Sequence, residues 1–416
     1  MDVEEILRTI GIVLAVGLIA IPIAALLRLP SMVVLVVAGI IAGPTLLNLV
    51  DVPIDGVGPS LLFTIGVALI LFHGGLGVSL RVISRTAVGL LLLAIPGVMI
   101  TAGIVALAVM PLFGVSWEIA LLVGAVLGAT DPAILVPLFD RLGLRPRVAQ
   151  TVIAESAIND PMGAILALTM AGIITAGGLT GSLIAGDSPL VEFLRNIGLG
   201  LVIGIVGGVL IAVLLSSRRF GVLRESVGAT LLAIVALAYV SSEVAGGSPY
   251  LAAFVAGLIV GNKDLIRIDH DHEQERMLEQ YTTQTVDIVV LAIFVVLGLN
   301  LDVQLLLDNL WAGLAVMAVF IFIARPATVA ICLGLDRRAG WTRQEAVFIG
   351  WCRETGVVPV AIASMLVAEK VPGAELVATL VTFAVIATLL LQATTAGWLA
   401  NRLGLLEAKP RLDPEA

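Results

Sequence analysis

Long uninterrupted apolar runs constrain this chain more than any other feature of its sequence. The first of them, residues 6–27, contains a single charged residue, Arg8. An α-helix needs about twenty apolar residues to cross the hydrocarbon core of a bilayer, whereas membrane β-strands are alternating segments of about ten residues. The whole chain is 59% hydrophobic and 13% charged. A soluble domain has about a quarter of its residues charged, so this chain is too apolar to be one. These runs therefore predict transmembrane α-helices.

Short polar or Gly/Pro-containing breaks divide the chain into about thirteen predicted spans. The predicted spans are 6–27, 31–50, 57–80, 87–113, 117–139, 149–176, 190–216, 226–244, 248–261, 281–300, 305–335, 344–368 and 374–401. The connections between them leave no room for a water-soluble regulatory domain. We expect an all-α membrane protein in which residues 1–406 form one polytopic unit and residues 407–416 form a short tail.

Basic residues alternate between the two sides of this arrangement. Most arginines fall in every second connection, and the opposite connections hold only Arg8, Arg195 and Lys370. Cytoplasmic loops carry an excess of Lys and Arg, so the pattern predicts a cytoplasmic C-terminus and an external N-terminus in the inner membrane. Because the start of the chain lacks a basic region and a cleavage site, we expect the first helix to be retained.

Two of the predicted spans are interrupted near their middle. Span 117–139 contains Asp131-Pro132, and span 344–368 contains Gly356 and Pro359. Proline cannot donate to the helical ladder, and Gly/Pro-interrupted spans in corresponding halves indicate a transporter built from two inverted-topology repeats. We expect spans 1–6 and 8–13 to be the repeats, each with one discontinuous helix. Ordinary proline kinks are the alternative.

Charged residues lie deep in these spans, where each costs about 2.5–3.5 kcal/mol or more. The segment ESAINDP of span 149–176 brings Glu155, Ser156, Asn159 and Asp160 within one arc of a helix. We expect this arc to face the interrupted fifth span.

Carboxylate, hydroxyl and freed carbonyl oxygens in that arrangement suit a small hard cation. Asp160 is the expected carrier, since burial and a neighbouring carboxylate favour its protonated form and let H⁺ compete with the cation. Asp131 is expected to be a more distant ligand. Arg325 needs an acidic partner, for which Glu155 is the candidate in a mainly structural ion bridge.

Several motifs resemble those of the monovalent cation/proton antiporters, in their electroneutral NhaP-like and NHE-like branch. They are GATDPAILVPLF, ESAINDPMGAIL, SPYLAAFVAGLIVGN, LAIFVVLGLNLD, the arginine of IARP, and RETGVVP. The resemblance spans nearly the whole chain in the same order. It implies an NhaA-like fold in which two discontinuous helices cross, and a homodimer that exchanges Na⁺ for H⁺ by elevator-like alternating access.

The resemblance also implies roles for segments and residues. Scaffold and dimerisation helices would lie at about 1–86 and 190–304, and a mobile core at about 87–176 and 305–406. Thr130, Ser156 and Asp160 would bind Na⁺ directly, with Asp131 and Asn159 beside them. Because electrogenic relatives carry Asp where Asn159 stands, and a Lys on the tenth span that this chain lacks, the resemblance implies one-for-one, electroneutral exchange.

Three residues are candidate modulators of this site. Relatives often carry an acidic residue at the position of His73, which is therefore either a pH-sensitive group or a neutral packing residue. Arg353 and Glu354 lie in the break of the twelfth span. The acidic segment 269–276 is expected to be a solvated connection, with metal binding or pH sensing as the alternatives.

Other functional classes fit the sequence less well. No nucleophile–base pair, phosphate loop or metal-ligand set indicates an enzyme, no cofactor or nucleic acid is expected, and Cys332 and Cys352 are expected to be small core residues. A K⁺/H⁺ antiporter of the same fold, a cation channel and a proton-coupled symporter stay open. The sequence does not choose between Na⁺, Li⁺ and K⁺.

Overall fold

The computed structural model describes residues 3–27, 29–54, 56–83, 86–130, 139, 143–179, 188–216, 222–223, 225–266 and 272–406. Each of the predicted spans contains at least one helix. Among the described residues, nine helices are long and apolar enough to cross a membrane, and four shorter apolar helices accompany them. The prediction of an all-helical, multi-pass membrane protein is confirmed.

The helices of the first part are α1 (Val3–Leu27), α2 (Ser31–Ala42), α3 (Val57–Gly77), α4 (Leu80–Ile83), α5 (Ala87–Ala94), α6 (Pro96–Phe113), α7 (Trp117–Gly128) and α9 (Pro146–Thr175). The middle of the chain forms α11 (Pro189–Leu214), α12 (Val227–Ala245), α13 (Pro249–Gly261), the 3₁₀ turn η1 (Lys263–Ile266) and α14 (His272–Leu299).

The last part forms α15 (Val303–Asp308), α16 (Leu310–Val319), η2 (Phe320–Ala324), α17 (Arg325–Leu335), α18 (Arg343–Trp351), α19 (Val357–Ala368), α20 (Ala374–Ala387), η3 (Thr388–Ala393) and α21 (Thr394–Arg402). The segments η2 and η3 are π-helical. Each continues the helices on either side of it, so α16–η2–α17 and α20–η3–α21 are continuous spans.

Two predicted boundaries are wrong. The second span, predicted to reach residue 50, ends at Ala42, because Gly43 is extended and the following Pro44 disfavours a helical residue before it. The acidic segment 269–276 is not wholly a loop: residues 272–276 begin α14, where acidic side chains favour a helix N-terminus. Glu275 pairs there with Lys263 at 2.8 Å. Residues 269–271 lie outside the described residues.

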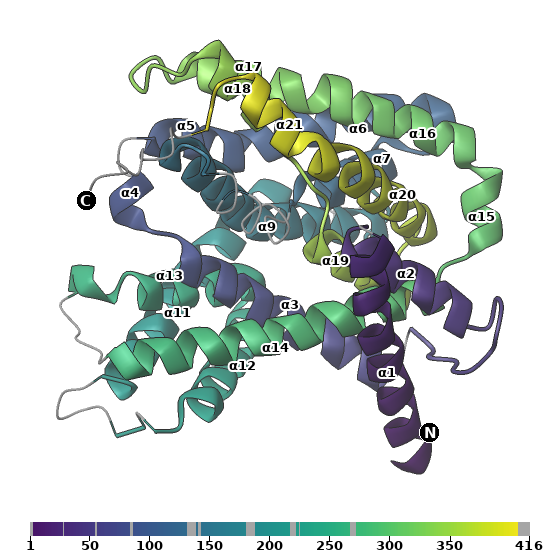
Figure 1. The fold of residues 1–416 in the computed structure, drawn as a ribbon, viewed down its shortest axis with the longest axis horizontal. Coiled ribbons are helices and arrows are strands. Elements are labelled where there is room, and N and C mark those ends of the chain that lie inside the picture. Colours follow the sequence, from purple (N-terminus) through teal and green to yellow (C-terminus); the bar gives the residue numbers. More distant parts are fainter. Residues whose placement is uncertain are drawn as a thin grey trace, which may run out of the picture.

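The helices form two groups in space. In Figure 1, α1–α3 and α11–α14 occupy the lower half of the view, and α5–α7, α9 and α16–α21 occupy the upper half. Helix α9 packs against α7 in its own group and against α3, α11 and α13 in the other. It is therefore enclosed: 72% of its apolar segment is buried in the protein, against 22% of that of α1. The side chains that α1 leaves exposed are large and apolar, as expected of a face turned to lipid.

Glycines allow the closest helix approach in the lower group. A side chain at Gly257 of α13 would collide with the backbone carbonyl of Phe72 on α3, and one at Gly75 of α3 would collide with the carbonyl of Phe254 on α13. Small residues at helix interfaces let backbones approach closely in membranes. The α3–α13 contact therefore depends on glycine from both sides.

Replacing Gly257 by Val should destabilise the protein by about 1–3 kcal/mol, because the added side chain must push the two helices apart. The measurement is thermal unfolding in detergent. Gly103→Val on α6 is the matched control, since nothing lies within 4 Å of the position its Cβ would take. Equal melting temperatures for the two variants would show that the close approach carries no stability.

Candidate functional site

The first interruption begins where α7 ends. Helix α7 stops at Gly128, and Ala129 has extended backbone angles. In the sequence Pro132 follows four residues after Gly128, and a proline cannot donate to the carbonyl four residues before it. Carbonyls at the end of α7 are thus left for partners from outside the helix.

Thr130 lies in this interruption and is held by three side chains of α9. Its amide donates to Asp160 Oδ1 at 3.0 Å and to Asn159 Oδ1 at 3.2 Å. Ser156 Oγ donates to the Thr130 carbonyl at 2.6 Å, and Asn159 Nδ2 donates to Thr130 Oγ1 at 2.8 Å. The open backbone is therefore satisfied by α9, and the predicted cluster of Thr130, Ser156, Asn159 and Asp160 is present as a hydrogen-bonded group.

Helical spacing explains why α9 supplies all three partners. Ser156, Asn159 and Asp160 are at positions i, i+3 and i+4, which share one face of an α-helix. None of the three is more than 6% exposed. The group contains a carboxylate, two hydroxyls, an amide oxygen and a backbone carbonyl in a buried place, and these are the oxygens that hard monovalent and divalent cations prefer.

Asp131, predicted to lie beside this cluster, is outside the described residues. Within the part of the chain that the structure describes, no group of three or more His, Cys, Asp or Glu side chains is arranged to hold a metal ion. As far as the described residues go, the Thr130 cluster consists of neutral oxygens around the carboxylate of Asp160.

Glu155 lies next to Ser156 but faces a different helix. Arg325, the first residue of α17, donates through Nη1 to Glu155 Oε1 at 2.5 Å and through Nη2 to Oε2 at 2.8 Å. Both side chains are at most 3% exposed, and Nη2 also donates to the carbonyl of Ile349 on α18. The expected ion bridge is present with paired, two-pronged geometry, and it joins α9, α17 and α18.

The backbone before Arg325 widens into the π-helical η2. Pro326 follows Arg325 and cannot donate to the carbonyl of Phe322. Short π-helical turns inside α-helices often occur at functional sites. Here the wide turn directly precedes the arginine of the buried pair.

Arg353 connects the two interruptions. The second interruption, residues 352–356, separates α18 from α19. From there Arg353 Nη2 donates to the carbonyl of Gly128 at 2.6 Å and to that of Leu127 at 3.3 Å. A guanidinium at the end of α7 satisfies the carbonyls freed there and opposes the negative end of the helix dipole.

Arg353 has two further contacts. Its Nη1 lies 3.3 Å from Thr101 Oγ1 on α6, and its guanidinium lies 5.3 Å from the ring centre of Phe320. Thr101 is a site residue that the sequence reasoning missed. A polar residue in an apolar span could have indicated it, but many threonines in such spans bond only to their own helix.

The other two candidate modulators are Glu354 and His73. Glu354 is 1% exposed in the second interruption. His73 on α3 is half-buried, and the carboxylates of Asp287 and Glu279 on α14 act on it electrostatically. Its neighbour Gly74 faces Ala157 of α9, so His73 lies on the surface of α3 near the site without belonging to the hydrogen-bonded group.

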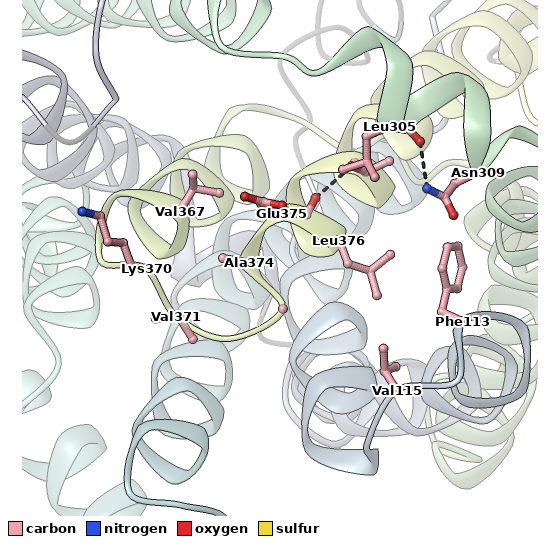
Figure 2. Close-up of a pocket in the computed structure, with 12 residues that line it drawn as sticks. Phe113, Val115, Leu305, Asn309, Val367, Lys370, Val371, Ala374, Glu375 and Leu376 are labelled. Atoms are coloured by element: carbon pink, nitrogen blue, oxygen red, sulfur yellow. Dashed lines mark hydrogen bonds between the residues drawn. The ribbon is translucent and has the colours of Figure 1, made fainter.

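A cavity of about 490 Å³ lies elsewhere (Figure 2). Its walls come from the α6–α7 connection, α15, and the turn between α19 and α20. Phe113, Leu305, Val371 and Leu376 make it largely apolar, and none of the residues predicted for the site lines it. This cavity is thus distinct from the carboxylate cluster.

Comparison with known proteins identifies the family. A family model described as "Sodium/hydrogen exchanger, transmembrane" matches residues 11–402. The chain belongs to the sodium/hydrogen exchanger family. Both interruptions and the whole Thr130 cluster fall within the matched residues.

Individual members of the exchanger family match over nearly the full chain. A protein named K⁺/H⁺ antiporter NhaP2 from Shewanella sp. strain MR-4 is 30% identical over 99% of this chain and 69% of its own length. A probable Na⁺/H⁺ antiporter from Methanocaldococcus jannaschii is 28% identical over 97% of this chain and 98% of its own length. The structure of the sodium proton antiporter MjNhaP1 from the same archaeon at pH 8 superimposes with a TM-score of 0.79, at 25% identity, over 96% of this chain and 99% of that one.

Removing one partner of the buried bridge should destabilise this exchanger strongly. Arg325→Met leaves the Glu155 carboxylate buried without its cation, which costs about 3–5 kcal/mol. The double variant Glu155→Leu/Arg325→Met should recover much of that loss, because both charges are gone. Thermal unfolding in detergent measures both. Arg402→Met is the control, since Arg402 is exposed on α21; an Arg325→Met protein that melts with that control would contradict a stabilising bridge.

Proposed function

We propose that this protein exchanges Na⁺ or K⁺ for H⁺ across the cytoplasmic membrane, with Asp160 as the group that holds either the proton or the cation. The observation that supports this assignment is the position of Asp160. Its side chain is 6% exposed, it lies on an enclosed helix, and it bonds to backbone opened by the end of α7. Intramembrane carboxylates placed in this way mark ion pathways.

Competition for one carboxylate couples the two ions. A buried, unneutralised carboxylate is costly, so Asp160 crosses the membrane either protonated or beside a cation. Ser156 and Thr130 would add hydroxyl and carbonyl ligands to the cation, with Asp131 as a further ligand in the sequence-based assignment. In the protonated state the hydrogen bonds among Thr130, Ser156 and Asn159 keep these oxygens satisfied.

The exchange is proposed to be one-for-one and electroneutral. Asn159 occupies the position next to Asp160 and binds Thr130 through both its amide oxygen and its amide nitrogen. A neutral amide carries no second proton, and Glu155 is held by Arg325. Among the described residues Asp160 is the one carboxylate of the cluster, which supports exchange of one proton for one monovalent cation.

Alternating access is proposed to come from movement of the upper helix group of Figure 1 against the lower one. The upper group would be the mobile core, at about 87–176 and 305–406, and the lower group the scaffold, at about 1–86 and 190–304. The two interruptions lie within the upper group, joined by Arg353, which supports their moving as one body. A homodimer formed through the scaffold fits the exposed apolar face of α1.

The orientation proposed is an external N-terminus and a cytoplasmic C-terminus. It rests on the arginine-rich connections, which include Arg145 before α9 and Arg337 and Arg338 between α17 and α18. Relatives carry both Na⁺/H⁺ and K⁺/H⁺ names, so transport by the reconstituted protein with each cation in turn decides the substrate.

Asp160→Asn should abolish exchange. Asparagine keeps an oxygen that can accept the Thr130 amide but cannot ionise, so neither proton nor cation can be carried. The measurement is the cation-dependent change of internal pH in proteoliposomes, with Asp308→Asn, an exposed carboxylate at the end of α15, as the control. A folded Asp160→Asn protein with normal turnover would remove Asp160 from its role.

Competition also predicts the pH dependence. Below the pH at which Asp160 is half-protonated, the apparent KM for the cation should rise about ten-fold for each unit by which the pH falls, as mass action between two ligands for one site requires. The maximal rate should change little.

Electroneutral exchange predicts that the transport rate at fixed pH is the same with and without an imposed membrane potential. A rate that follows the potential would contradict one-for-one exchange.

A further inference from the structure

The second interruption contains a hydrogen bond that parallels the first. In the first, the amide of Thr130 donates to a side chain of the next long helix. In the second, the amide of Thr355 donates to Thr388 Oγ1 at 3.0 Å. Thr388 is the first residue of η3, in the span that follows α19. Each opened backbone is therefore held by the span after it, with a carboxylate in one case and a neutral hydroxyl in the other.

Gln392 holds the other side of the same interruption. Its Nε2 donates at 2.6 Å to the carbonyl of Trp351, the last residue of α18. Gln392 is 1% exposed, and its Oε1 has no hydrogen-bond partner among the described residues. Burying a polar side chain is costly unless hydrogen bonds compensate for the lost water. The bond to Trp351 is thus the contact that accounts for a glutamine at this position.

The π-helical backbone of η3 presents the two side chains together. Thr388 and Gln392 are four residues apart, which places them on nearly the same face of a helical turn. Their partners, Trp351 and Thr355, are also four residues apart: Trp351 ends α18, and Thr355 lies near the far end of the interruption. The two bonds therefore hold the backbone on both sides of Arg353, at the end of α18 and near the end of the interruption.

Arg353 lies midway between these two fixed points. Its guanidinium donates to the carbonyl of Gly128, two residues before Thr130. A displacement of the backbone around Arg353 would therefore reach the end of α7 and the Thr130 cluster through one side chain.

We propose that Thr388 and Gln392 are positioning residues for cation exchange: they hold the second interruption so that Arg353 fixes the end of α7 beside the cation site. The proposal rests on the function proposed for Asp160. Neither side chain hydrogen-bonds to the Thr130 cluster among the described residues; both act through Arg353.

The test compares isosteric variants in proteoliposomes. Thr388→Val removes the acceptor of the Thr355 amide, and Gln392→Met removes the donor to Trp351. Each should raise the apparent KM for the cation by about three- to ten-fold, the equivalent of one ordinary hydrogen bond, with a smaller change in maximal rate per folded molecule. Thr388→Ser keeps the oxygen and should restore the parent KM.

Thr382→Val is the matched control. Thr382 is fully buried in the same span, and its hydroxyl donates to the carbonyl of Ala378 in its own helix. Thr388 makes the same kind of bond, to Ala384, so the control removes that bond without touching the interruption. Thr382→Val should leave the KM unchanged.

A lowered melting temperature with an unchanged KM in both Thr388→Val and Gln392→Met would overturn the proposal and leave these residues a purely structural role. Because the two bonds are separate, either variant suffices if the other fails to fold. Asp160→Asn, measured alongside, separates the two ideas. An active Asp160→Asn protein would refute the carrier assignment, whereas an inactive one with normal KM in Thr388→Val and Gln392→Met would refute only the positioning role.

Discussion

Opened backbone in the interior of the membrane is the constraint on which the rest of this structure depends. Hydrocarbon offers no hydrogen-bond partner, so every amide and carbonyl released where a helix stops must find one inside the protein. At the first interruption the amide of Thr130 binds Asp160 and the carbonyl of Gly128 binds Arg353. Asp160 and Arg353, both buried, therefore each bind a backbone group released at the end of α7.

This arrangement would give Asp160, the proposed carrier, two linked roles. Asp160 accepts a backbone amide, and in the proposed mechanism it also exchanges a proton for a cation. In that mechanism, binding or release of the proton or the cation changes the charge next to the end of α7. The state of the ion site and the geometry of the interruption would therefore be coupled by direct contact. Glu155 is one residue away from Ser156 but is held by Arg325. Two neighbouring buried carboxylates on one helix thus have different environments because they face different partners.

The two interruptions satisfy a threonine amide with different chemistry. At the first interruption a titratable carboxylate holds the threonine amide, and at the second a neutral hydroxyl does so. A hydroxyl keeps its acceptor at every physiological pH, whereas a carboxylate changes charge. In the proposed mechanism the second interruption would therefore remain fixed while the first responds to ion binding, and Arg353, which bonds to the Gly128 carbonyl, would transmit the position of one to the other.

The sequence by itself determined the membrane class, the approximate positions of most apolar helices and the two places where a helix stops inside a predicted span. These features depend on local sequence patterns: apolar length, proline and helical spacing. Helical spacing also predicted that Ser156, Asn159 and Asp160 share one face. The pairing of Glu155 with Arg325 could also be predicted from the sequence, because an arginine inside the membrane needs an acidic partner. The predicted second span ran past the true helix end at Ala42, although Pro44 indicates a break there, because apolar residues continue on both sides of the turn. Only the tertiary structure decided that Arg353 reaches the carbonyl of Gly128, 225 residues earlier in the chain, and that Thr388 and Gln392 hold the second interruption. Those contacts depend on which helices become neighbours in space, and no local pattern in the sequence records that.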